Sequence, residues 1–267
     1  MERIKQALER ARSQRGGERV GAAPRSHEKA PIEQKIVYTQ TRTIELSPEH
    51  LRQHRVISGP TDPVANYYSV LRTHVMQSMR ANNWRTLAIT SPNEGAGKSL
   101  TALNLAISMA RETNHTVLLV DLDLKRPNIH RYLGKAQLPG ISDYILDDAP
   151  LPELLVNPGI ERLVILPGHK SLSHSSEMLS SPKMVSLVED VKSRYPSRLV
   201  IFDMPPVLAC DDVLAFSPYF DAALLVVSEG ETQKGDVTRA IELLGKAELM
   251  GTVLNKSSES ASGYGYY

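Results

Sequence analysis

The sequence predicts an α/β fold built on a doubly wound, mainly parallel sheet with helices on both faces. Two observations carry this prediction. Short apolar runs, of the kind that form strands buried on both faces, recur from about residue 86 onward. Stretches with helical character lie between several of these runs, and alternating strands and helices indicate a parallel sheet.

The predicted strands and helices can be located by their residue ranges. The six expected strands are TLAIT (86–90), TVLLVD (116–121), RLVILP (162–167), RLVIFD (198–203), ALLVVS (223–228) and GTVLN (251–255). The two clearest helices between them are expected over residues 99–112 and 236–247. The 267 residues, of which 41% are hydrophobic, are enough for one such domain with extensions.

Composition divides the chain into three regions. Residues 1–55 are expected to hold a short N-terminal helix and a flexible polar linker, and residues 56–256 a globular domain. Residues 257–267, SSESASGYGYY, read as a small, polar, flexible tail. For the N-terminal helix, a docking helix and a frayed solvated segment are both open readings, because short isolated helices are weak.

Charge and cysteine content exclude several functional classes. The net charge of +1 gives no field that would attract nucleic acid. The single cysteine, Cys210, excludes a disulfide or a cysteine-based metal cluster within the chain and fits a reducing, cytoplasmic setting. No apolar run reaches the ~18 residues that a membrane helix needs, and the N-terminus is too charged for a signal peptide. We therefore expect a soluble protein that is free to act beside a membrane.

The segment SPNEGAGKSLTALNLA, directly after the first predicted strand, has the features of a phosphate-binding loop. Gly95 and Gly97 would let backbone N–H groups face an anion, and Lys98 would reach the β and γ phosphates of ATP. Ser99 would ligate Mg²⁺ through its hydroxyl. Pro92 stands where the general pattern has its first glycine. The alternative is an ordinary glycine turn before a helix.

Aspartates follow two of the predicted strands. Asp121 and Asp123 end one of them, and Asp203 ends another, just before a Pro-Pro turn. The carboxyl ends of parallel strands meet at one edge of the sheet, where ligands bind. A single aspartate is more often a helix cap or turn residue. Three aspartates at two strand ends, beside a phosphate loop, indicate a nucleotide–Mg²⁺ site.

Together these motifs resemble the bacterial tyrosine autokinases of capsular and exopolysaccharide biosynthesis. The matching segments are the loop at 91–99, a D-x-D-x-R-like motif at 121–125 and a D-x-P-P motif at 203–206. Further matches are HRYLG (130–134), GISDYI (140–145), SSEMLSSPKM (175–184) and DAALLVVSEGET (221–232). The resemblance covers about residues 60–256 and the tail, and is greatest to the CpsD and CapB proteins and to the stand-alone kinases found near exosortase genes. It implies a P-loop NTPase fold of the MinD and ParA type.

The resemblance also implies the roles of individual residues. The catalytic residues would be Lys98, Asp121 and Asp203, and Mg²⁺ would be held by Ser99, Asp121 and Asp203. The ATP-binding residues would be Glu94, Gly95, Ala96, Gly97, Lys98, Ser99, Leu100 and Asn255. Asn255 is equally well explained as a turn residue at a strand end.

The activity that the resemblance implies is ATP-dependent phosphorylation of the chain's own tail tyrosines, Tyr264, Tyr266 and Tyr267, in the regulation of polysaccharide polymerisation and export. One alternative is a MinD- or ParA-like positioning ATPase without kinase activity. Another is an ATP-binding regulator whose tail is a docking peptide. The tail tyrosines favour the kinase, since a positioning ATPase has no use for them.

The implied partners are a membrane polysaccharide co-polymerase, of the Wzz chain-length-determinant type, whose cytoplasmic segment activates the kinase, and a cognate tyrosine phosphatase. A homo-oligomer is a further implied partner, and nucleic acid is not expected. The implied location is cytoplasmic, at the inner membrane through the partner.

The chain departs from the family pattern at several positions. Lys125 replaces the arginine of the second motif. Asn66 and Ser69 replace a glutamate and an arginine of the family's ring-forming motif, of which only Arg72 remains. Asn93 stands where the partition ATPases have an extra lysine, which argues against their mode of dimer switching.

Overall fold

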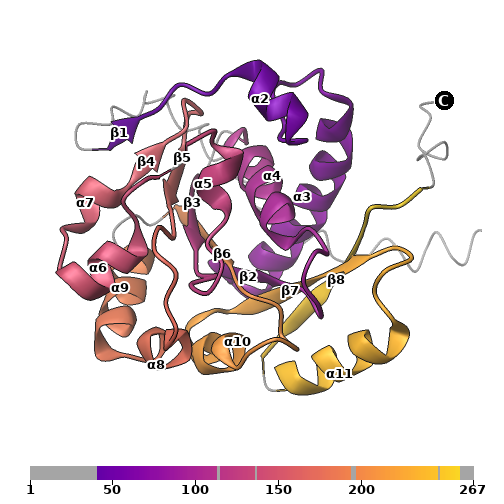
Figure 1. Cartoon of the computed structure of the whole chain (residues 1–267). Helices are drawn as coiled ribbons and strands as arrows, with labels where there is room; N and C mark the ends of the chain where they lie inside the picture. The colour runs from indigo at the N-terminus through magenta and orange to yellow at the C-terminus, as the bar shows by residue number, and fades with distance from the viewer. Residues whose placement is uncertain (1–40, 113–114, 136, 194–196, 246, 259–267) are drawn as a thin grey trace, which may run out of the picture. The chain divides into compact units, whose positions relative to one another are not determined.

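The computed structural model describes residues 41–112, 115–135, 137–193, 197–245 and 247–258. Within these ranges the chain forms an eight-stranded sheet in the order β1-β4-β5-β3-β6-β2-β7-β8 (Figure 1). Neighbouring strands run parallel except β4 and β5, which are antiparallel. The predicted α/β class with a mainly parallel sheet is therefore confirmed. The predicted N-terminal helix and the tail tyrosines lie outside the described residues.

The six predicted strands are all present. The strands are β1 (Arg42–Thr43), β2 (Thr86–Thr90), β3 (Thr116–Asp121), β4 (Val156–Asn157), β5 (Leu163–Leu166), β6 (Arg198–Asp203), β7 (Ala222–Ser228) and β8 (Leu249–Asn255). Strands β2, β3 and β6 have the predicted bounds, and β5, β7 and β8 differ from them by one or two residues at an end. Apolar runs bounded by polar residues therefore located the central strands well.

The helices lie in the connections between strands. They are α2 (Pro48–Gln53), α3 (Pro63–Asn82), α4 (Lys98–Ala110), α5 (Ile129–Tyr132), α6 (Ile141–Asp147), α7 (Leu151–Leu154), α8 (Ser175–Leu179), α9 (Pro182–Ser193), α10 (Asp212–Phe216), the 3₁₀ helix η1 (Ser217–Tyr219) and α11 (Lys234–Leu244). The two helices expected from the sequence correspond to α4 and α11, each of which begins one or two residues earlier than predicted.

Each central strand sends alternate side chains into two separate cores. In β2, Leu87 and Ile89 belong to one core, whereas Ala88 belongs to the other. Helices α2, α3, α4 and α5 contribute to the first core, and α6 to α11 contribute to the second. Figure 1 shows these two sets of helices on opposite faces of the sheet. A strand buried on both faces must be apolar at every position, which explains its continuous apolar sequence.

Strands β1 and β4 were not predicted, and neither was helix α2, which lies where a linker was expected. Strand β1 pairs with β4, and α2 buries Leu51 in the first core, as does Ile44 just after β1. Strand β1 and helix α2 precede residue 56, in a segment expected to be linker. A two-residue strand has no periodicity that a sequence pattern could reveal.

The sheet brings three strand ends together at one edge. Strand β6 lies between β2 and β3, and Asp121 of β3 is the register partner of Asp203 of β6. The phosphate-loop segment follows β2 at the same edge. This edge is where ligands bind in open parallel sheets. In the part of the chain that the structure describes, no helix is long and apolar enough to span a membrane.

Candidate active site

The loop between β2 and α4 depends on two glycines. Gly95 and Gly97 have φ angles of 78° and 91°, which favour glycine. A Cβ atom on Gly97 would overlap the side-chain amide of Asn255, which donates a hydrogen bond to the carbonyl oxygen of Ala96 at 2.8 Å. The end of the last strand therefore holds the loop directly. The predicted adenine contact of Asn255 stays a prediction.

Both unusual residues of the loop have a structural role. The carbonyl oxygen of Pro92 accepts a hydrogen bond from the backbone N–H of Leu208 at 3.1 Å. The side chain of Asn93 donates to the carboxylate of Asp236 on α11 at 2.6 Å. The loop is thus attached to the segment after β6 and to α11, and Asn93 makes a contact within the chain at the position of the partition ATPases' lysine.

Lys98 is the first residue of α4 and is buried between two acids. Its Nζ lies 2.7 Å from Asp123 Oδ2 and 3.6 Å from Asp203 Oδ1. Burial by itself would lower the pKa of the Lys98 ammonium, but the charges of Asp203 and Asp123 raise this pKa above its ordinary value. The ammonium is therefore charged at neutral pH, and it also donates a hydrogen bond of 3.3 Å to the Ser99 hydroxyl.

Asp203 is fully buried, and neither of its carboxylate oxygens has a hydrogen-bond partner among the described residues. Burial raises the pKa of this carboxyl, and the charge of Lys98 opposes that shift. Buried carboxylate oxygens without partners are uncommon, because their desolvation is costly. A divalent cation between Asp203 and the phosphates of a nucleotide would satisfy them. The residues present therefore fit Mg²⁺, and the neighbouring Ser99 hydroxyl would be a second protein ligand.

Asp121 is engaged by the backbone instead. Its Oδ2 accepts hydrogen bonds from the N–H groups of Asn128 and Ile129, both at 3.0 Å, and its Oδ1 accepts one from Asp123 at 3.3 Å. Burial and the charge of Asp203 raise the pKa of Asp121 to about 7, although the bond from Ile129 opposes this shift. Asp121 therefore holds the start of α5 in place, whereas Asp123 reaches Lys98.

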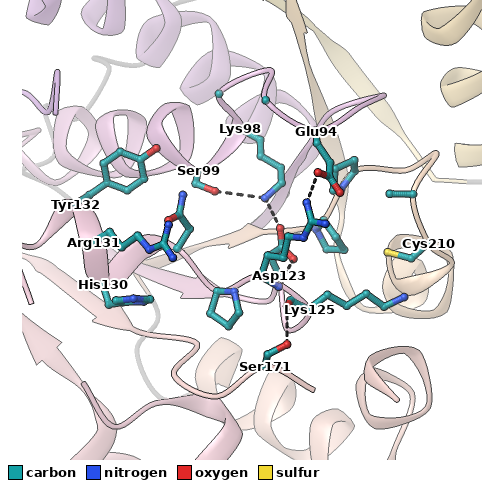
Figure 2. Close-up of a pocket in the computed structure, with 18 of the residues that line it drawn as sticks. Glu94, Lys98, Ser99, Asp123, Lys125, His130, Arg131, Tyr132, Ser171 and Cys210 are labelled. Atoms are coloured by element: carbon teal, nitrogen blue, oxygen red, sulfur yellow. Dashed lines mark hydrogen bonds and ion pairs between the residues drawn. The ribbon is translucent and has the colours of Figure 1, made fainter. Parts of the chain in front are cut away.

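A cavity of about 800 Å³ opens beside these residues (Figure 2). Its phosphate-loop side is formed by Glu94, Gly95, Gly97, Lys98 and Ser99. The other lining residues are Asp123, Lys125, Arg126, Pro127, Asn128, His130, Arg131, Tyr132, His169, Ser171, Pro205, Pro206, Ala209 and Cys210. Its volume lies in the range of small-molecule sites. Burial raises the pKa of the Cys210 thiol to about 11, so this thiol is neutral at physiological pH.

Some of the predicted site residues line this cavity and others do not. Ala96, Leu100, Asn255, Asp121 and Asp203 are not among the residues that line it. Leu100 packs against the first core, so only its backbone can serve a ligand. Glu94 lines the cavity and forms an ion pair with Arg126.

Sequence reasoning missed an aspartate–histidine pair at the end of β5. His169 Nδ1 lies 2.7 Å from Asp143 Oδ2, and Asp143 also accepts a hydrogen bond of 2.8 Å from the backbone N–H of Gly140. His169 has a φ of 76°, uncommon for a residue with a side chain. The pair spans 26 residues of sequence, and a histidine after a Pro-Gly turn was its only signal.

The surviving arginine of the family's ring motif points into its own chain. Arg72 donates a hydrogen bond to the carbonyl oxygen of Ser108 at 3.3 Å and lies 3.5 Å from Glu112. Ser69 donates to the carbonyl oxygen of Ala65 within α3 at 2.9 Å, and Asn66 is exposed. These contacts explain how the segment is stable here with two of the three family residues replaced.

Comparison with known proteins first identifies the class of fold to which the chain belongs. A sequence profile of the AAA domain matches residues 84–229, from β2 to just after β7. The septum site-determining protein MinD of Pyrococcus horikoshii, solved with Mg-ADP, superimposes with a TM-score of 0.53 at 24% identity over 66% of this chain and 72% of that one. The fold is that of the P-loop NTPases.

Proteins with greater similarity to this chain identify a family within the P-loop NTPases. The tyrosine-protein kinase YwqD of Bacillus subtilis is 31% identical over 81% of this chain and 92% of its own length. The kinase domain of the Escherichia coli tyrosine kinase ETK superimposes with a TM-score of 0.69 at 25% identity, covering 89% of this chain and 99% of that one. The chain spans only 26% of the tyrosine-protein kinase ptk of Acinetobacter johnsonii, at 28% identity over 73% of this chain. The chain belongs to the bacterial tyrosine-protein kinase family, as its motifs predicted.

Proposed function

We propose that the chain uses ATP to phosphorylate the tyrosines of its own C-terminal tail, Tyr264, Tyr266 and Tyr267. The observation that carries this proposal is the buried Lys98, which lies between Asp123 and Asp203 at the start of α4. A charged ammonium, a hydroxyl and a carboxylate without a hydrogen-bond partner among the described residues, all at one strand edge, are groups that phosphoryl transfer uses. The kinase names of the relatives support the same activity.

Different residues of the site would bind the phosphates of ATP and Mg²⁺. The backbone of the loop and Lys98 would hold the phosphates of ATP, and Ser99 and Asp203 would hold Mg²⁺. Bound Mg-ATP supplies the phosphoryl group and neutralises part of its charge. Lys98 would exchange part of its contact with Asp123 for a phosphate oxygen.

Two carboxylates are candidates for accepting the proton of the tyrosine hydroxyl. The family resemblance favours Asp121, whose pKa of about 7 suits a proton acceptor at neutral pH. Asp123 lines the cavity, whereas Asp121 is fully buried. We propose that Asp121 accepts the proton through Oδ1, which carries a single long hydrogen bond, and that Asp123 orients Lys98.

We propose the family's setting for this activity. The chain would act in the cytoplasm at the inner membrane, where a Wzz-type polysaccharide co-polymerase activates it and a cognate phosphatase reverses the modification. Phosphorylation of three tyrosines would give the tail a strong negative charge, about −1.5 to −2 for each. Such a change would alter contacts with the partner or with other copies of the chain, and so regulate polysaccharide polymerisation and export.

The first prediction tests the kinase function. Lys98→Met should abolish phosphotyrosine on the tail of purified protein given Mg-ATP, because no other described cation lies within 4 Å of both acids. Mass spectrometry of the C-terminal peptide measures it. The matched control is Lys234→Met, which removes an exposed lysine on α11 and should label normally.

Folding of the Lys98→Met protein is checked by its unfolding midpoint, since the change leaves two buried acids without their cation. Equal tail labelling in this variant and in the parent would disprove the proposed mechanism. Nucleotide hydrolysis without any phosphotyrosine in the parent would instead favour a positioning ATPase.

A further inference from the structure

One wall of the cavity carries four basic side chains that the proposed transfer step does not use. These are Lys125, His130, Arg131 and His169, which we call the cationic ledge. They come from the segment after β3, from α5 and from the turn after β5. Figure 2 shows Lys125 and His130 lower in the view than Lys98 and Ser99.

Two of the four ledge residues, Lys125 and Arg131, lack anionic partners in the described part of the chain. Lys125 and Arg131 are exposed, and neither side chain makes an ion pair or a hydrogen bond there. Arg126, by contrast, is paired with Glu94. The Nδ1 atom of His130 is buried without a hydrogen-bond partner. A buried polar atom without a partner, beside two unpaired cations, indicates room for a ligand with several acceptor oxygens.

The surroundings of His130 disfavour its charged form. Burial lowers the pKa of His130, and the charges of Arg131 and His169 lower it further. His169 is held by Asp143 through Nδ1, which leaves its other nitrogen without a partner among the described residues. A bound anion would relieve this repulsion and accept hydrogen bonds from these groups.

A phosphate ester has the charge and the oxygens that such a site recognises. The phosphate loop already accounts for the phosphates of the nucleotide. A second phosphate ester arises within the proposed reaction, on a tail tyrosine that has already been modified. We propose that the cationic ledge binds a phosphotyrosine of the tail and so places a neighbouring tyrosine for the next transfer. This inference rests on the kinase function proposed above.

The spacing of the tail tyrosines agrees with this role. In an extended segment, Tyr264 and Tyr266 would point to the same side about 7 Å apart. The ledge follows β3 and β5, which lie one and two strands from β6 and its Asp203. Neighbouring strands are about 5 Å apart, so the ends of β3 and β5 lie about 5 and 10 Å from the end of β6 across the sheet. One tyrosine could occupy the ledge while the other reaches the transfer site.

The test compares two peptides of the tail sequence. Both keep Tyr264 as acceptor and carry Tyr267→Phe; one has phosphotyrosine at position 266 and the other carries Tyr266→Phe. The enzyme is the full chain with all three tail tyrosines changed to phenylalanine. At saturating Mg-ATP we expect kcat/KM to be at least about tenfold higher for the phosphopeptide, the effect of one charge-assisted hydrogen bond.

In the Lys125→Ala/Arg131→Ala protein, the ratio of kcat/KM for the phosphopeptide to kcat/KM for the unphosphorylated peptide should fall to about one. The matched control, Arg85→Ala/Arg239→Ala, removes two exposed arginines outside the cavity and should keep the ratio of the parent. Because each ratio is taken within one protein, a general loss of activity does not affect it.

A ratio near one in the parent, or an unchanged ratio in the Lys125→Ala/Arg131→Ala protein, would disprove the role of the ledge and leave the kinase function standing. A ledge occupied by nucleotide phosphates would also give a ratio near one at saturating ATP. Transfer to neither peptide would overturn the kinase function and, with it, the ledge.

Discussion

Three aspartates at neighbouring strand ends have three different environments. Asp121 accepts hydrogen bonds from three backbone N–H groups, Asp123 pairs with Lys98, and Asp203 has no hydrogen-bond partner among the described residues. These different environments were not evident from the sequence. The difference arises because β3 ends at Asp121, so that Asp123 lies in a loop and is free to turn toward the lysine. The two acids, two residues apart in the sequence, therefore have different contacts.

The second prediction concerns the pH dependence of Asp121. The folded protein holds this proton up to about pH 7, whereas the unfolded chain releases it near pH 4. Unfolding therefore releases a proton between these values, and stability falls as pH rises across the window. Asp121→Asn should reduce the fall of the unfolding free energy with pH by up to about 1.4 kcal/mol per pH unit. Urea unfolding of nucleotide-free protein in EDTA, from pH 5 to 7.5, measures it.

The asparagine oxygen at position 121 can still accept the hydrogen bonds of Asn128 and Ile129, so the variant should fold. Glu49→Gln, an exposed acid-to-amide change on α2, should leave the slope as in the parent. If Asp121→Asn and the parent lose stability equally with rising pH, the buried carboxyl does not titrate in this range.

At the scale of elements, α4 connects the phosphate loop to the segment that precedes α3. The side chain of Asn104, fully buried in α4, accepts a hydrogen bond from the backbone N–H of Ile57 and donates one to the carbonyl oxygen of Arg55, both at 2.9 Å. The same helix has Gly97 as its N-cap and begins at Lys98. A polar residue in an apolar helix is thus explained by backbone groups that need partners in the core.

The third prediction follows from this contact. Asn104→Ala would leave a buried N–H and a partly buried carbonyl without partners, which should lower the free energy of unfolding by about 2 to 4 kcal/mol. Urea denaturation at constant pH measures the change. Asn82→Ala, at the exposed end of α3, should change stability by no more than about 0.5 kcal/mol. Equal losses in the two variants would show that the connection through Asn104 does not stabilise the fold.

For the whole molecule, the sequence predicted the sheet with helices on both faces, but it did not predict which side chains contact one another. The central strands were predictable because burial on both faces demands an apolar residue at every position. The phosphate loop was predictable because its glycines and Lys-Ser pair are adjacent in sequence. The pairs Lys98–Asp123 and His169–Asp143 join residues 25 and 26 positions apart, so only the folded sheet brings them together. Strands β1 and β4 were missed because two residues carry no periodicity.

The last prediction concerns where the fold begins. Ile44 and Leu51 are 4% and 7% exposed, and the backbone N–H of Ile44 donates to the carbonyl oxygen of Asn157 at 2.9 Å. Removing residues 1–55 should therefore destabilise the protein relative to removing residues 1–40. Burying such a side chain contributes about 1.5 to 3 kcal/mol, so the two together predict a loss of about 3 to 6 kcal/mol. Urea unfolding of the two truncated proteins at the same concentration measures the difference.

Ile44→Ala/Leu51→Ala in the protein that lacks residues 1–40 should reproduce most of the loss. Equal unfolding midpoints for the two truncated proteins would mean that β1 and α2 lie on the domain without stabilising it, and that the linker reading of residues 41–55 was energetically correct.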